Sequence, residues 1–343
     1  MKRLLTFLHP HARDDLSKVL PKDTLPLWPW YTTVSRLNHK PDAFHSKSMG
    51  EPISELITLP DHKLTFSDVM DKRALELLKL DGTIFVMWSG GIDSTGVVSA
   101  ILKNWPKEDL KRVTILCSTL SIKENKSFFP HIVKNFKIDQ VTHNLEKFAR
   151  QGYIITGELG DQIFGSDVIH QCINHWGEEV ILKDWKDIAP QLFKKIDPVL
   201  GEAVFQNYAG IVDEAPFELK STFDFFWWLN FTQKWQHVKY RALISTTWTD
   251  PKQYFPKVVH FFEGVDFQLW SIYNHGSKVP STWNDYKKIA KDYIMDYTND
   301  PETMSQLKIA SGPNLYVGVE PNWAIDEDWN FISRDEAFKR LRY

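Results

Sequence analysis

The sequence predicts an α/β fold in which a doubly wound, mostly parallel sheet is followed by a mostly helical C-terminal region. The main observation is an alternation between residues 66 and 156. Short apolar runs of strand length alternate there with segments whose apolar residues recur at helical spacing. This pattern is typical of parallel strands joined by crossover helices. A second observation is that strand-length runs become rare beyond about residue 180, where helical spacing dominates.

The alternation begins with a helix that we expect over residues 66–80, with Ser67 as a candidate N-cap. The run Ile84–Trp88 is apolar throughout, which is the pattern of a central parallel strand buried on both faces. From Ser94 onward the apolar residues fall on one helical face. A helix is therefore expected directly after the first strand.

The same alternation continues along the chain. Further strands are expected at 112–117, 139–144 and 153–156, and helices at 128–136, 145–152, 185–196, 223–245 and 285–298. We therefore divide the chain into an irregular N-terminal cap (1–65), an α/β domain (66–180) and a mostly helical C-terminal region (181–343) that completes the site.

Composition and charge favour a soluble protein. Of the 343 residues, 43% are apolar and 25% are charged, and the formal net charge of -3 does not indicate nucleic acid as the main partner. The aromatic run 223–231 is too short to span a bilayer, and the N-terminus does not fit a signal peptide. Because Cys117 and Cys172 cannot form a disulfide framework, a reducing cytoplasm is the expected location.

The hexapeptide SGGIDS at 89–94 stands where the first strand gives way to a helix. Its glycines allow backbone N–H groups to approach an anion, and the helix N-terminus adds partial positive charge. Hydroxyl groups can donate to phosphate oxygens, and an aspartate suits a Mg²⁺ ion that neutralises them. The candidate nucleotide-binding residues are Ser89, Gly90, Gly91, Asp93, Ser94 and Thr95.

An ordinary strand-to-helix turn with a serine or aspartate cap is the alternative for this stretch. The complete hexapeptide at this position favours a phosphate loop over that alternative. It is not a Walker A loop, because no Gly-Lys-Ser/Thr follows, and it lacks the GxGxxG spacing of dinucleotide folds.

SGGIDS resembles the SGGxDS signature of the PP-loop ATP pyrophosphatases. The resemblance implies an adenine nucleotide alpha hydrolase-like fold that binds ATP and Mg²⁺. It also implies cleavage of ATP between its α and β phosphates, with adenylation of a substrate and release of pyrophosphate. Amide ligation, tRNA lysidine formation, thiolation and nucleobase nitrile synthesis all occur among enzymes with this signature.

A second motif, YIITGELGDQIFGSD at 153–167, is similar to a glycine-rich segment of asparagine synthetases and their relatives. A strand end delivers its acids to the same sheet edge as Asp93. By this resemblance Asp93 and Asp161 would be the metal ligands, Glu158 an acid/base or orienting residue near the adenylate, and Gly157 part of the nucleotide site. Two departures from the family pattern are Leu159, in place of a glycine, and Gln162, in place of a glutamate.

Two weaker similarities extend the resemblance toward the C-terminus. The segment 118–129 resembles one that receives adenine, so Leu116 to Leu120, with Cys117 and Leu120 as candidate contacts, would border the base. The segment 258–274 also resembles a family stretch, and Lys287 then stands at the position of the catalytic lysine. A lysine near the α-phosphate would stabilise charge that develops during adenylation. Lys288 and Lys308 are the alternatives for this role, and Lys291 corresponds to an arginine of the family.

These motifs lead us to expect an ATP-dependent amide-forming ligase that acts on a small-molecule carboxylate and on ammonia or another amine. Asparagine synthetases carry an N-terminal glutaminase whose nucleophile is a cysteine after the initiator methionine. Lys2 stands at that position here, and the chain before Ile84 is too short for such a domain. One alternative is a nucleobase- or tRNA-modifying PP-loop enzyme. Another, suggested by Leu159 and Gln162, is a degenerate ATP- or AMP-binding module.

Overall fold

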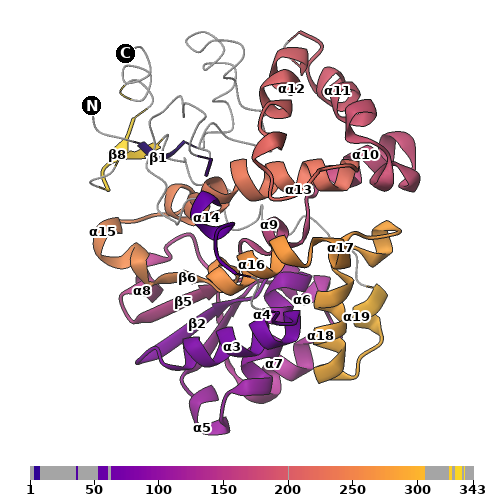
Figure 1. Cartoon of the computed structure of the whole chain (residues 1–343). Coiled ribbons are helices and arrows are strands. Elements are labelled where there is room, and N and C mark those ends of the chain that lie inside the picture. Colours follow the sequence, from indigo (N-terminus) through magenta and orange to yellow (C-terminus); the bar gives the residue numbers. More distant parts are fainter. Residues whose placement is uncertain are drawn as a thin grey trace.

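The computed structural model of the chain describes residues 4–7, 36–37, 53–60, 63–199, 201–305, 324–326, 329–333 and 336. Its centre is a five-stranded sheet in which all neighbouring strands are parallel (Figure 1). In their order across the sheet, the strands are β4 (Lys137–Gln140), β3 (Val113–Cys117), β2 (Thr83–Met87), β5 (Gly152–Thr156) and β6 (Val258–His260). Helices flank this sheet, so the predicted doubly wound parallel α/β fold is confirmed as a Rossmann-like arrangement.

The described residues form many short and medium-length helices around this sheet. They are α2 (Ile53–Leu56), α3 (Phe66–Leu78), α4 (Ile92–Asn104), α5 (Lys107–Leu110), α6 (Thr119–Glu124), α7 (Phe129–Asn135), α8 (Glu146–Ala149), α9 (Gly160–Phe164), α10 (Val168–Trp176), α11 (Trp185–Ile196), α12 (Gly201–Ala209), α13 (Thr222–Gln233), α14 (Trp235–Ser245), α15 (Pro251–Tyr254), α16 (Val265–Tyr273), α17 (His275–Lys278), α18 (Lys288–Thr298) and α19 (Glu302–Ser305). The helices expected after the first strand and over 185–196, 223–245 and 285–298 are therefore present, the third as the pair α13 and α14.

The strand order creates a topological switch point beside β2. The chain moves outward from β2 to β3 and β4, and then returns to place β5 and β6 on the other side of β2. The loops that leave the carboxyl ends of β2 and β5 therefore run in opposite directions. A crevice forms at such a point in open parallel sheets, and ligands bind there.

Alternate residues of β2 belong to two separate hydrophobic cores, one on each face of the sheet. Ile84 and Val86 are buried in a cluster with residues of α3, α4 and α18. Phe85 belongs to the other cluster, with residues of α8 and α14, and its ring lies 5.1 Å from that of Phe148. A strand covered on both faces requires the continuous apolar run that the sequence contains.

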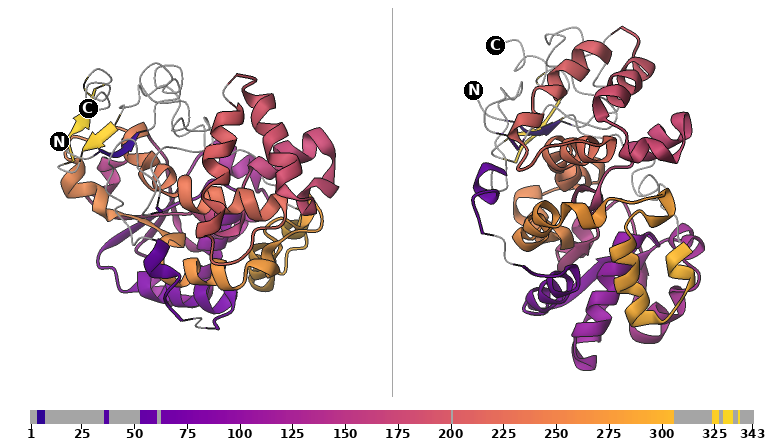
Figure 2. Two further views of the ribbon diagram at one scale, coloured as in Figure 1. Left: turned by 45° about the horizontal axis from the view of Figure 1, so that its top comes forward. Right: turned by 45° about the vertical axis from the view of Figure 1, so that its right-hand side comes forward.

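Helix α13 is buried around nearly its whole circumference. Among its aromatic residues, Trp227 and Trp228 are fully buried. A helix without a polar face is stable only inside a protein, so the aromatic run there forms core. Figures 1 and 2 place α10–α13 at one end of the molecule and the sheet with α3, α4 and α7 at the other.

Four strands of the structure are not predicted from the sequence. Strands β1 (Leu4–Phe7), β7 (Ala324–Asp326) and β8 (Phe331–Ile332) form a small antiparallel sheet, which joins an N-terminal segment to two C-terminal ones. Strand β6 lies in the region expected to be mostly helical and completes the central sheet. These strands are two to four residues long, and segments of that length carry too few residues to reveal an alternation.

Two boundaries differ from expectation. Helix α3 is capped by Thr65, which forms a reciprocal capping box with Asp68, so Ser67 is not the N-cap. The strand expected at 139–144 lies at 137–140, where all residues of β4 are exposed. Because β4 is at the sheet edge, its sequence carries no apolar run that would mark its position.

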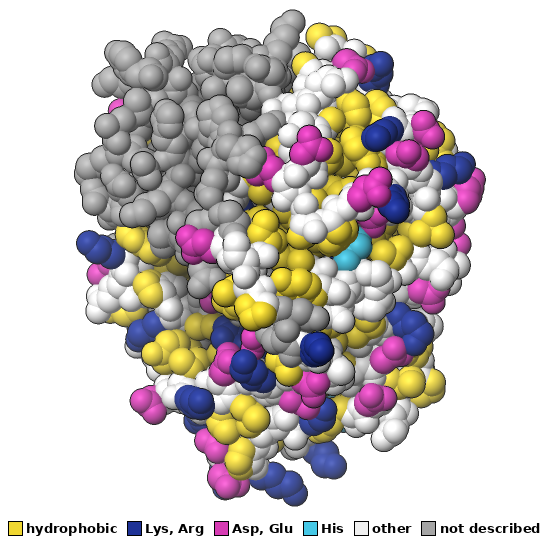
Figure 3. Space-filling model, viewed as in Figure 1, with side chains coloured by type: hydrophobic (Ala, Val, Ile, Leu, Met, Phe, Trp, Pro, Cys, Tyr) yellow, Lys and Arg dark blue, Asp and Glu magenta, His cyan; other side chains and the backbone are white. Residues whose placement is uncertain are grey.

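The surface has mixed charge where it can be seen. On the face drawn in Figure 3, basic and acidic side chains of the described residues are interspersed rather than gathered by sign. In the part of the chain that the structure describes, no helix combines the length and apolar character needed to cross a bilayer.

Two buried histidines make the stability of the fold depend on pH. His275 donates a hydrogen bond to the Asp224 carboxylate at 2.7 Å, yet burial lowers its pKa to about 4 from 6.5. Burial also lowers the pKa of His260. Between pH 6.5 and 4 the unfolded chain therefore binds protons at His275 that the folded chain does not. The stability that neutral His275 contributes is fully present above pH 6.5 and is lost as the pH falls toward 4.

We expect the free energy of unfolding to fall by about 3 kcal/mol from His275 alone over this pH range, because each pKa unit corresponds to about 1.4 kcal/mol. Urea denaturation at a series of pH values measures this. His275→Gln should flatten the pH dependence, whereas His175→Gln, at an exposed position, should leave it unchanged. An equal slope in wild type and His275→Gln would contradict the assignment.

Candidate active site

The loop between β2 and α4 is held together by its own hydroxyl groups. The Ser94 hydroxyl accepts a hydrogen bond from the backbone N–H of Ser89 and donates to the carbonyl of Gly91, both at 3.1 Å. The Ser89 hydroxyl lies 3.0 Å from that of Ser94 and accepts from the Gly91 N–H at 3.3 Å. The loop therefore has a defined shape before any ligand binds.

Gly90 can be only a glycine for two independent reasons. Its φ of +87° lies in the left-handed region, and an added Cβ would stand 2.3 Å from the carbonyl oxygen of Ser121 in α6. Helix α6 thus packs directly against the loop. Thr95 supports the loop from inside, because it is fully buried and its hydroxyl accepts from Trp88 at 3.0 Å and Asn125 at 3.3 Å.

Helix α4, like α10 and α16 among others, has no side chain that caps its N-terminus. Its N-cap residue is Gly91, which has no side chain to accept from the first helical N–H groups. Helices α3, α6 and α13 each carry a side-chain cap, from Thr65, Ser118 and Ser221. The positive end of the α4 dipole therefore points toward the switch point without a side-chain acceptor of its own.

The loop after β5 lies in backbone contact with this loop. An added Cβ on Gly157 would lie 2.9 Å from the backbone nitrogen of Ser94, and one on Gly160 would lie 2.4 Å from Cγ of Asp93. Between these glycines, Leu159 has a φ of +72°. It keeps the left-handed conformation typical of glycine, at a cost of about 1–2 kcal/mol, while its side chain is buried.

Three predicted site residues meet at one point. The Nζ atom of Lys287 lies 2.7 and 2.5 Å from the two carboxylate oxygens of Asp93, and 2.6 Å from Oδ1 of Asp161. The Lys287 side chain is 2% exposed, and those of Asp93 and Asp161 are 20% and 27% exposed. The rings of Phe164 and Tyr286 stand 5.7 and 5.6 Å from the amino group. This cluster lies where the β2 and β5 loops touch.

The other lysines considered from the sequence do not reach this cluster or lie outside the description. Lys288 is exposed and pairs with Asp292 one turn along α18, at 2.7 Å. Lys308 lies outside the described residues. Lys291 is buried and donates to the Asn284 carbonyl at 2.7 Å, and burial lowers its pKa. Lys287 itself precedes α18, in the left-handed conformation with φ +59°.

Glu158 is held by a residue that the sequence did not reveal. Both of its carboxylate oxygens lie 2.5 Å from Nη2 of Arg241 in α14. Its backbone N–H donates to the Thr156 hydroxyl, which in turn donates to Nδ1 of the buried His260 at 2.7 Å. His260 donates from Nε2 to the Lys239 carbonyl at 2.8 Å, which leaves Nδ1 as an acceptor. No local motif marks Arg241, and the resemblance of segment 258–274 assigns no role to His260, because both roles arise only from packing across the sheet edge.

Gln162 faces away from the cluster. It is buried and donates to the side-chain oxygen of Asn230 in α13 at 2.9 Å. Asn230 then donates to the carbonyls of Asp161 and Gly165, at 3.1 and 2.6 Å. The neutral amide at 162 is therefore part of a bridge that attaches α13 to α9 at the carboxyl edge of the sheet.

The residues expected to border adenine flank the same edge. Cys117 ends β3 and is buried, which raises its thiol pKa. Leu120 lies in α6, and its side chain is 48% exposed. Cys117 therefore lies two residues before α6, the helix that packs on Gly90, and Leu120 lies within it. That they contact an adenine base stays a prediction.

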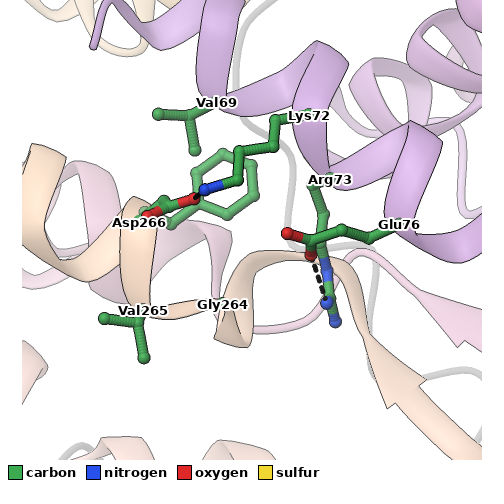
Figure 4. A pocket seen from close by; sticks show the side chains of 8 residues that line it. Val69, Lys72, Arg73, Glu76, Gly264, Val265 and Asp266 are labelled. Atoms are coloured by element: carbon green, nitrogen blue, oxygen red, sulfur yellow. Dashed lines mark hydrogen bonds and ion pairs between the residues drawn. The ribbon is translucent and has the colours of Figure 1, made fainter.

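A pocket of about 300 Å³ lies elsewhere, between α3 and the start of α16 (Figure 4). Its charged groups pair with one another: Lys72 with Asp266 at 2.5 Å and Arg73 with Glu76 at 3.1 Å. None of the candidate site residues lines it. We therefore assign the functional site to the switch point rather than to this pocket.

Comparison with known proteins gives no relative to guide the assignment. No family model matches this chain, and no curated protein or solved structure is significantly similar to it. The interpretation of the site therefore depends on its own residues and geometry.

Gly160 offers a direct test of the close contact between the two loops. Gly160→Ala should lower the free energy of unfolding by about 1–3 kcal/mol, because the added methyl would overlap the Asp93 carboxylate. Gly276→Ala is the matched control, since a Cβ there meets no atom within 4 Å. Urea denaturation compares the two variants. Equal stability of Gly160→Ala and wild type would show that the loops are not packed as described.

Proposed function

We propose that this chain is an ATP-dependent ligase of the PP-loop type, similar to the synthetase part of asparagine synthetases. It would adenylate a carboxylate, release pyrophosphate and join the acyl group to ammonia or another amine. The observation that carries the proposal is the convergence of Lys287, Asp93 and Asp161 beside a helix N-terminus at the switch point.

The β2–α4 loop suits the phosphates of ATP. Gly91 brings no side chain to the α4 N-terminus, whose partial positive charge favours an anion, and Gly90 lets α6 pack against the loop. The hydroxyl groups of Ser89 and Ser94 lie in the same loop, 3.0 Å from each other. The loop would thus hold the pyrophosphate part of ATP.

The carboxylates of Asp93 and Asp161 fit a Mg²⁺ ion. They come from two different strand ends, yet both reach the same amino group within 2.7 Å, so their oxygens converge. Carboxylate oxygens together with substrate phosphates are the usual ligands of Mg²⁺. A bound Mg²⁺ would supply charge neutralisation for the phosphates.

Lys287 and Glu158 would act on the reacting groups. The Lys287 amino group can stabilise negative charge that develops at the α-phosphate as the carboxylate attacks. Glu158 is partly exposed and is oriented by Arg241, so its carboxylate can accept a proton from the attacking amine. Arg241 then acts as a positioning residue that keeps this carboxylate in one orientation.

The departures at Leu159 and Gln162 favour an active enzyme over a degenerate binding module. Leu159 retains the backbone conformation that glycine would adopt, and Gln162 bonds to Asn230 in α13. Neither change removes a group from the cluster. Cys117 and Cys172 are free and buried, which agrees with the proposed location in the reducing cytoplasm.

ATP–pyrophosphate exchange, measured with a panel of small carboxylates, tests this function. We expect exchange that depends on both the carboxylate and Mg²⁺, with AMP as the nucleotide product after an amine is added. Retained ATP binding without exchange for any carboxylate would contradict the ligase and favour a binding module. Formation of AMP with tRNA or a nucleobase, without pyrophosphate exchange for any carboxylate, would favour the modifying enzyme instead.

Asp93→Asn should reduce exchange by at least about a hundredfold while the protein remains folded, because one metal-binding carboxylate is lost. Asp139→Asn, on the exposed edge strand β4, is the matched control and should retain activity. Circular dichroism verifies folding in both variants. Undiminished exchange in Asp93→Asn would remove Asp93 from the metal site.

A further inference from the structure

Lys287 occupies the place between two carboxylates where a cation would be expected. Its Nζ atom is within hydrogen-bonding distance of both oxygens of Asp93 and of Oδ1 of Asp161. With a side chain that is 2% exposed, the amino group is screened from water by the surrounding packing, which includes Phe164 and Tyr286. Burial and the neighbouring carboxylates raise the pKa of the Tyr286 hydroxyl, so this group stays neutral.

An amino group and a divalent cation cannot share this position. Mg²⁺ needs its oxygen ligands at 2.0–2.1 Å in near-octahedral geometry. Nζ stands at 2.5–2.7 Å from both oxygens of Asp93 and from Oδ1 of Asp161, so a metal bound to these same oxygens would overlap it. Two positive charges at such a separation repel strongly inside a protein. The metal and the Lys287 amino group must therefore occupy this position one at a time.

We propose that Lys287 is the resident counter-ion of the metal site. It pairs with Asp93 and Asp161 when no metal is bound, and it must leave them before a divalent cation binds. The identity of the natural ligand, Mg²⁺ with ATP, rests on the proposed function, whereas the competition between Lys287 and a cation rests on the geometry alone.

This competition couples the metal to the nucleotide. A cation that arrives alone must displace Lys287 into a poorly hydrated surrounding, where the amino group has lost its partners. ATP offers that group new partners, since its phosphate oxygens would lie beside the adjacent loop. The metal and the nucleotide should then bind cooperatively, and each should increase the affinity for the other by the same factor. Lys287 would thus suppress metal binding without substrate.

The experiment measures Mn²⁺ binding in the absence of nucleotide, from the electron paramagnetic resonance signal of free Mn²⁺. We expect Lys287→Met to bind Mn²⁺ at least tenfold more tightly than wild type. Lys287→Arg, which retains the positive charge, should not bind more tightly. Lys288→Met is the matched control on the exposed side of α18 and should behave as wild type. Adding Asp93→Asn to Lys287→Met should remove the gain, which locates the ion.

A second measurement, of the melting temperature, distinguishes a change in Mn²⁺ affinity from a folding defect. Without metal, Lys287→Met removes a positive charge from between two carboxylates, so its melting temperature should be lower than that of wild type and should rise more when Mn²⁺ is added. Lys287→Gln is the replacement variant if Lys287→Met does not fold, with the same expected gain. In a folded variant, Mn²⁺ affinity equal to or weaker than that of wild type would overturn the proposal.

The outcome is separable from that of the proposed function. If wild type shows no pyrophosphate exchange but Lys287→Met binds Mn²⁺ more tightly, the counter-ion role stands and the ligase assignment fails. If wild type exchanges pyrophosphate but Lys287→Met gains no Mn²⁺ affinity, the ligase assignment stands and the counter-ion role fails.

Discussion

The contact of Lys287 with Asp93 and Asp161 is the interaction on which the rest of the site depends. It joins three segments that are far apart in the sequence: the first turn of α4 after β2, the first turn of α9 after β5, and the residue that precedes α18. Charges of opposite sign that are shielded from water attract strongly, but they also need partners at all times. The same pairing therefore stabilises the empty site and limits what can enter it.

Close backbone packing makes this contact geometrically feasible. Gly157 and Gly160 let the β5 loop approach the β2 loop to a distance that any Cβ would prevent. Leu159 keeps a left-handed conformation between them, and the bonds from Asn230 attach the following helix to α13. Strain and tight packing are concentrated where the two loops meet, as is common at sites that must hold a fixed geometry.

Much of the fold, and the central cluster, follow from the sequence. The long apolar strands predict the parallel sheet and place the SGGIDS turn at a strand end, because strand and helix periods are strong local signals. The motif around Asp161 and the resemblance at Lys287 predict residues that the structure does bring together. The roles of Arg241 and His260 could not be predicted, since they arise from contacts with residues 83 and 104 positions away in the sequence. Short strands such as β6 also carry too little pattern to be recognised.

The most direct measurement is anomalous diffraction from crystals of the protein grown with Mn²⁺ and a non-hydrolysable ATP analogue. The account predicts an anomalous peak between Asp93 and Asp161, with the Lys287 amino group withdrawn from both carboxylates and directed toward the phosphates. A structure in which the nucleotide is bound while Lys287 still bridges Asp93 and Asp161, with the metal elsewhere, would contradict it.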